Sequence, residues 1–126
     1  MYRLVVLVAV LLTAAPARAQ QAAPEVVARN LAENVLGPRT VRSVRVSAGG
    51  RYIDIVWDAV LYRPAHSPAR NREQLRGEAE LATGSIMGVL RPAAIDFTMM
   101  VGRRAIARGR RTPEEFTITY AQELGG

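Results

Sequence analysis

The chain has 126 residues and a formal net charge of +6, and 49% of its residues are hydrophobic. This length fits one domain with a modest core, and the absence of cysteine excludes disulfides and thiolate metal sites. Every basic side chain is arginine, which we attribute to coding bias in a GC-rich genome rather than to a binding code.

The start of the chain has the pattern of a signal peptide. A short basic start precedes the apolar run Leu4–Ala15, and Ala17 and Ala19 form a small-x-small cleavage site. The run is shorter than the roughly 20 residues that a membrane-spanning helix needs. We therefore expect residues 1–19 to be a signal peptide cleaved near Ala19, and residues 20–126 to be a single periplasmic or secreted domain. The alternative is that the segment is retained as an anchor.

The exported part begins with a helix and a hairpin. Apolar residues recur at four-residue intervals from Pro24 until Gly37 and Pro38 end the pattern, which predicts a helix over 24–36. A β-branched run over 41–47 and a regular alternation over 51–63 then flank a turn sequence rich in glycine. This arrangement predicts an antiparallel hairpin.

The alternation over 51–63 assigns the residues of this strand to two faces. The core face is expected to hold Ile53, Ile55, Trp57, Ala59 and Leu61. The outer face is expected to hold Tyr52, Asp54, Val56, Asp58, Val60 and Tyr62.

A second helix and two further strands complete the predicted domain. Ser67 and Pro68 are typical of a helix start, and helical spacing from Leu75 onward predicts a helix over 69–88. Alternation returns over 94–107 and 115–121, with a polar turn over 108–113 between the two strands. Glutamates on the helix, Glu73, Glu78 and Glu80, are expected to form surface pairs with neighbouring arginines.

The order of these elements predicts an α+β fold. The single small domain reads α-β-β-α-β-β, and its four strands form an antiparallel sheet with both helices on one face. Those helices would cover a core that contains Ile53, Trp57, Phe97 and Phe116.

No motif in the sequence indicates catalysis, a metal or a cofactor. His66 is the only histidine, and Asp54 and Asp58 lie about 13 Å apart on one strand, too far to ligate one ion. We therefore predict no catalytic residues, no metal and no cofactor. If the protein is nevertheless an enzyme with no recognisable motif, these three residues are the first to test.

Two surfaces are candidates for binding. Arginines gather near the predicted last turn and suggest contact with anionic lipid or another acidic surface, but not with nucleic acid, because no aromatic residue lies among them. The arginines are Arg103, Arg104, Arg108, Arg110 and Arg111. The second surface is the outer sheet face, which is apolar for a face that no predicted helix covers. Its candidate binding residues are Tyr52, Val56, Val60, Tyr62 and Met100.

These surfaces favour binding over catalysis. The leading hypothesis is a periplasmic accessory protein of the bacterial envelope that contacts an envelope protein, or forms a homo-oligomer, through the outer sheet face. The alternative is a carrier of a lipid or other small amphiphile held between helices and sheet.

Overall fold

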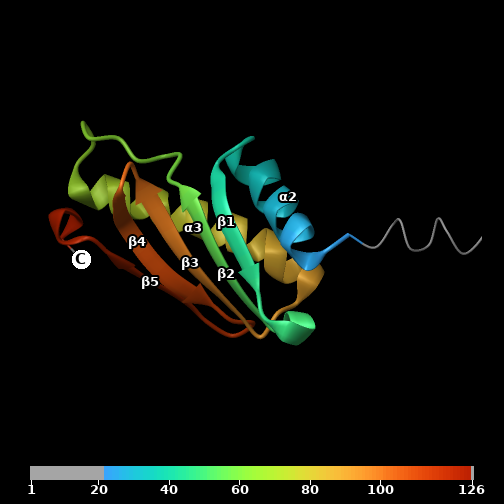
Figure 1. Ribbon diagram of the computed structural model, residues 1–126. Helices are drawn as coiled ribbons and strands as arrows, with labels where there is room; N and C mark the ends of the chain where they lie inside the picture. The colour runs from blue at the N-terminus through green and yellow to red at the C-terminus, as the bar shows by residue number, and fades with distance from the viewer. Residues whose placement is uncertain (1–21, 126) are drawn as a thin grey trace, which may run out of the picture.

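The computed structural model describes residues 22–125, so the predicted signal peptide lies outside the described residues. Two helices and five strands make up the domain (Figure 1). In chain order they are α2 (Pro24–Leu36), β1 (Val41–Val46), β2 (Tyr52–Asp58), α3 (Pro68–Leu90), β3 (Ala94–Val101), β4 (Arg104–Arg111) and β5 (Phe116–Tyr120). Short 3-10 turns lie at Ala48–Gly50 and Gln122–Leu124.

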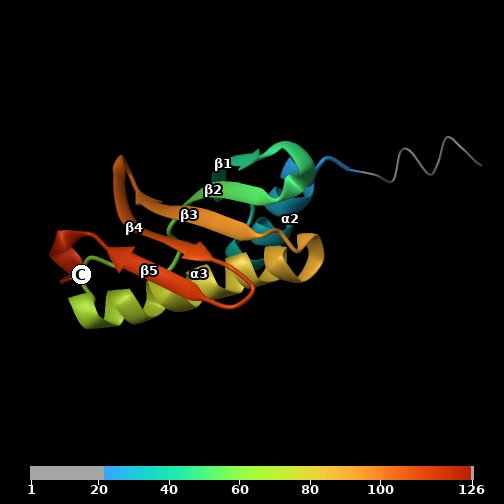
Figure 2. The ribbon, with the colours of Figure 1, turned by 90° about the horizontal axis from the view of Figure 1, so that it is seen from below.

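The five strands form one mixed sheet in the order β1-β2-β3-β4-β5. Neighbouring strands are antiparallel except for β2 and β3, which are parallel. Both described helices lie on the same side of this sheet, and no element within residues 22–125 covers its other face (Figure 2). The predicted α+β class is therefore confirmed. Neither described helix is long and apolar enough to cross a membrane.

The predicted strand count is wrong because one predicted strand is a hairpin. Gly102 has a φ of +60° and turns the chain back after β3, which divides the predicted strand 94–107 between β3 and β4. The predicted polar turn over 108–113 is largely strand β4. The last hairpin instead closes where the Thr112 N–H donates to the Glu115 carbonyl at 2.9 Å.

The prediction that all strands are antiparallel is also wrong, because α3 carries the chain back along the sheet. Its 23 residues span roughly 34 Å at 1.5 Å per residue, which is the length of a long strand. The chain therefore enters β3 at the end of the sheet where β2 began, and the two strands run parallel.

The strand predicted over 51–63 ends early, at Asp58, because a helix side chain takes over its hydrogen bonding. The carboxylate of Glu78 on α3 accepts the N–H of Val60 at 3.0 Å and that of Leu61 at 2.8 Å, and it also accepts the Trp57 indole N–H at 2.8 Å. Glu78 is thus buried, and the prediction that it lies on the surface is wrong. Glu80 does form the expected surface pair, with Arg76.

The core lies between the helices and the inner face of the sheet. Ile53, Ile55 and Trp57 are buried as predicted, whereas Leu61 is 40% exposed because the strand has ended before it. Rings from β2, β3 and β5 stack in series, with centroids 5.6 Å apart both between Trp57 and Phe97 and between Phe97 and Phe116. This aromatic series connects the centre of the sheet to its β5 edge.

Candidate functional site

The uncovered face of the sheet carries a row of charged residues. The strand register places Arg45, Asp54, Asp96 and Arg110 side by side on β1, β2, β3 and β4. Asp96 joins Asp54 only because β2 and β3 are parallel neighbours, so the sequence analysis missed it. The signal that could have found it is the shared apolar-Asp-apolar pattern at the two positions.

Ion pairs between arginines and aspartates link neighbouring strands on this face. Arg110 contacts both carboxylate oxygens of Asp96, with Nε 2.7 Å from Oδ1 and Nη2 3.0 Å from Oδ2. The hydrogen bond to Asp96, together with its charge, raises the pKa of Arg110 above its usual value. Arg42 Nε donates to Oδ1 of Asp58 at 2.6 Å, which forms a second ion pair on this face. Within residues 22–125, Asp54 forms no ion pair, which leaves its carboxylate available on the surface.

Three of the five candidate binding residues lie on this face, and two do not. Tyr52, Val56 and Met100 lie on the outer side of β2 and β3. Val60 and Tyr62 come after the end of β2 and pack against the core cluster, so their placement in the outer row is wrong. The outer face is consequently more polar than the sequence suggested.

A hollow of about 300 Å³ lies on this face beside Tyr52, a residue that is 52% exposed. Its charged lining comes from Arg45, Asp54 and Asp96. Small-molecule pockets usually enclose about 300 to 1,000 Å³ and bury most of their ligand. An open hollow at the lower end of that range fits one side chain of a binding partner better than a whole ligand.

The arginines near the last hairpin do not converge on one surface. Arg108 and Arg110 lie on the outer face, whereas the Arg111 guanidinium lies 6.0 Å from the Phe116 ring centroid on the helix side. Arg104 is engaged by Glu123, and Arg103 lies exposed in the turn between β3 and β4. The five residues therefore form no shared anion site, and contact with an acidic surface stays a prediction.

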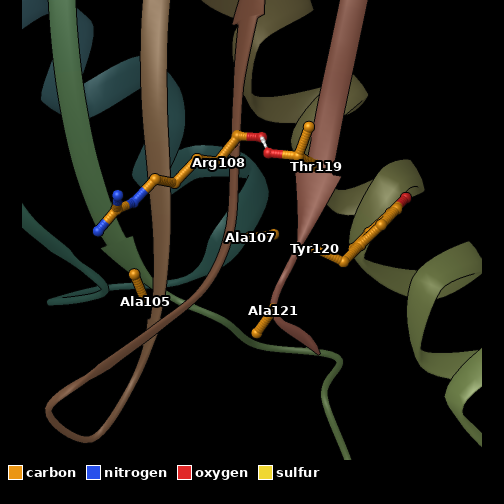
Figure 3. A pocket seen from close by; sticks show the side chains of 6 residues that line it. All are labelled: Ala105, Ala107, Arg108, Thr119, Tyr120 and Ala121. Carbon is orange, nitrogen blue, oxygen red and sulfur yellow. Dashed lines mark hydrogen bonds between the residues drawn. The ribbon is translucent and has the colours of Figure 1, made fainter. Parts of the chain in front are cut away.

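A second open hollow, of about 310 Å³, lies at the end of β4 and β5 (Figure 3). The side chains of Arg108 and Tyr120 leave it in opposite directions, Tyr120 toward α3. The Tyr120 hydroxyl donates to the Arg72 carbonyl at 3.1 Å, and burial raises the pKa of that hydroxyl above its usual value. Because its polar groups do not converge, this hollow has no evident ligand chemistry.

The space where a carrier would hold an amphiphile is filled. The stacked rings occupy the layer between α3 and the sheet. An apolar hollow does exist at the seam of the helices, bordered by Val35, Leu61 and Leu81, but its volume is about 90 Å³. This volume is well below the usual size of a ligand pocket, so no observation favours the carrier alternative.

The residues suggested for an enzyme do not form a constellation. Asp58 is engaged by Arg42, and Asp54 lies on the outer face next to Asp96. His66 lies in the loop before α3, where its Nδ1 is buried and has no hydrogen-bond partner in the described part of the chain. Across residues 22–125, no group of three or more potential metal-ligating side chains is found.

No family model, curated protein sequence or solved structure matches the chain.

Proposed function

We propose that this protein is an exported accessory protein of the bacterial envelope, which acts by binding another envelope protein through the outer face of its sheet. The observation that carries the proposal is the hollow beside Tyr52, where an exposed aromatic ring meets the Asp54 carboxylate, which has no ion pair in the described chain, on a face that neither described helix covers. The apolar run and cleavage pattern at the start of the sequence support export.

The composition of this face resembles that of protein interfaces. Tyrosine, methionine and arginine are enriched in interfaces, whereas lysine is depleted. The outer face presents Tyr52 and Met100 together with arginines on β1 and β4. Tyrosine and arginine are also the residue types that most often dominate binding energy.

The acidic side of the hollow, next to Arg45, can receive a basic anchor residue from the partner. Both oxygens of Asp96 already contact Arg110, so the acceptor that remains is the carboxylate of Asp54. A lysine or arginine side chain placed there would pair with Asp54 and lie against the Tyr52 ring. A cation against an aromatic ring contributes about 0.5 to 1 kcal/mol at an exposed site.

Site-specific photo-crosslinking in the exporting cell tests the proposal. A photoreactive residue at position 56, in the centre of the outer face, should give one discrete adduct in the periplasmic fraction, on a chain that starts at Gln20. Tyr52→Ala and Asp54→Asn should each reduce that adduct at least about fivefold, because each removes one side of the anchor contact.

A matched position separates a specific contact from random collision. Val89 on α3 is more exposed than Val56, so random collisions should reach it at least as often, but it lies on a helix, away from the outer face. The same photoreactive residue at position 89 should not give the adduct. The proposal is overturned if both positions give the same adducts, or if the adduct from position 56 persists in full in Tyr52→Ala and Asp54→Asn.

A further inference from the structure

Along the open side of the edge strand β5 lies a row of backbone groups that have no hydrogen-bond partner within residues 22–125. The hydrogen bonds from Thr112 N–H to Glu115 O and from Ala121 N–H to Ile106 O fix which β5 residues face β4. In an antiparallel ladder the intervening residues point their N–H and C=O groups the other way. These residues are Phe116, Ile118 and Tyr120, and no element of the described chain pairs with them.

The side chains of β5 read nearly the same in both directions about Ile118. The strand sequence is Phe-Thr-Ile-Thr-Tyr, with no charge, proline or bulge. An antiparallel copy centred on Ile118 would therefore place isoleucine opposite isoleucine, threonine opposite threonine and each Phe116 opposite a Tyr120. Aromatic and β-branched cross-strand pairs of this kind stabilise a sheet.

We propose that β5 pairs with β5 of a second copy, in antiparallel register about Ile118, to form a dimer with one continuous sheet. The open backbone groups of Phe116, Ile118 and Tyr120 then hydrogen-bond to those of the second copy. The occupant is a second copy because the strand is complementary to itself in both backbone pattern and side-chain type. This proposal does not depend on a partner at the outer face.

The register predicts how the exposed threonines meet across the dimer. Thr117 of one copy lies directly opposite Thr119 of the other, on the outer face, at a position where no backbone hydrogen bonds are exchanged. Side chains at such positions approach most closely, so like charges there repel and opposite charges attract. Both threonines are exposed in the described chain, so changing them leaves the core intact.

Two matched double variants test the dimer by sedimentation over a range of protein concentrations. Wild type should show reversible dimerisation with a dissociation constant in the micromolar range, because a pairing through one short edge buries a small area. Thr117→Lys with Thr119→Lys places lysine opposite lysine twice and should raise the dissociation constant at least about tenfold. Thr117→Glu with Thr119→Lys places glutamate opposite lysine twice and should restore dimerisation.

Amide hydrogen exchange gives a second readout that does not rely on variants. The Ile118 N–H should become protected as protein concentration rises, while the Thr117 N–H, which already faces β4, should change little. Tyr52→Ala, which alters the outer-face hollow, should leave both the dimer and this protection unchanged. Thermal unfolding checks that each double variant remains folded.

Several outcomes overturn the proposal. The proposal is wrong if wild type is monomeric at all concentrations, or if the lysine–lysine variant dimerises as strongly as wild type. If the lysine–lysine variant is monomeric and the glutamate–lysine variant does not recover dimerisation, the antiparallel register about Ile118 is wrong. Loss of the dimer in Tyr52→Ala would place self-association at the outer face instead.

Discussion

The two edges of the sheet differ in how their backbone is protected. Edge strand β1 carries Arg42 and Arg45 and a register shift after Val41, and α2 packs beside it (Figure 1). Charges, irregular pairing and a covering helix are common means of preventing edge-to-edge association. Edge strand β5 has none of these features in its five residues. One edge is thus closed to another strand, whereas the other remains open to one.

At the closed edge, two side chains of α2 form hydrogen bonds with the backbone of β1, as a neighbouring strand would. The Glu33 carboxylate accepts the Val41 N–H at 3.1 Å, and the Arg29 guanidinium donates to the Val41 carbonyl at 2.6 Å. At the open edge, side chains on the inner face attach β5 to the core. The Phe116 ring stacks on Phe97 in the aromatic series, and the Tyr120 hydroxyl donates to the Arg72 carbonyl on α3. The strand β5 is therefore firmly attached to the core while its outer backbone groups stay accessible.

The largest loss of stability is expected for a substitution at Gly109 on β4, where β5 packs against the core. A methyl group at this position would overlap the Thr117 carbonyl oxygen and the Phe97 ring, both of which are tightly packed. Gly109→Ala should lower the free energy of unfolding by about 3 kcal/mol or more, because the clash forces β5 and the ring series apart. Urea unfolding measures this change, and dimerisation through β5 should be lost with it.

Gly77→Ala is the matched control for this substitution. A methyl group at Gly77, on the exposed side of α3, meets no atom within 4 Å. The variant should therefore gain up to about 1 kcal/mol in unfolding free energy from helix propensity alone. Equal stability losses in the two alanine variants would show that the packing around Gly109 has been misassigned.

A smaller effect is expected when the closed edge is opened. Glu33→Ala leaves the Val41 N–H without its acceptor and should lower the free energy of unfolding by about 1 to 2 kcal/mol. Glu33→Gln keeps an acceptor oxygen in place and should lose less than half as much. If the glutamine variant is as unstable as the alanine variant, the charge of Glu33 rather than the hydrogen bond to Val41 stabilises this edge.

The sequence predicted those parts of the fold that depend on neighbouring residues. Pro24 and Gly37 place the ends of α2 correctly, and strict alternation assigns Ile53, Ile55 and Trp57 to the core. The turn after β3 was missed because the predicted alternation was extended past Gly102, although Ala105, Ile106 and Ala107 on its far side are consecutive apolar residues that do not alternate. The bulge in the pairing of β3 with β4 lets both Ile106 and Ala107 be buried, and it depends on contacts between the two strands.

Features set by contacts between distant segments were not predictable from one sequence. The early end of β2 depends on Glu78, which lies in the following helix and resembles its exposed neighbours in sequence. The pairing of Asp54 with Asp96 depends on the parallel alignment of β2 and β3, which the length of α3 imposes. The outer-face hollow, which contains both aspartates, could not be predicted for the same reason.

The smallest expected effect is the alkaline titration of Tyr120 at the open edge. Burial raises the pKa of Tyr120 in the folded protein, so the stability it contributes is complete below the unfolded value of about 10 and is lost as pH rises through the folded value. Tyr120→Phe should therefore lose less stability than wild type as pH rises above about 10. Because the chain has no lysine, tyrosines dominate titration in this range, and ultraviolet absorbance can follow them directly.

Pairing of β5 covers the Tyr120 ring with Phe116 of the second copy, which should raise the pKa of Tyr120 further. The titration midpoint assigned to Tyr120 should therefore move upward with protein concentration in wild type and stay fixed in the lysine–lysine variant. A midpoint independent of concentration in a proven dimer would mean that the paired edges leave Tyr120 as exposed as it is in the monomer.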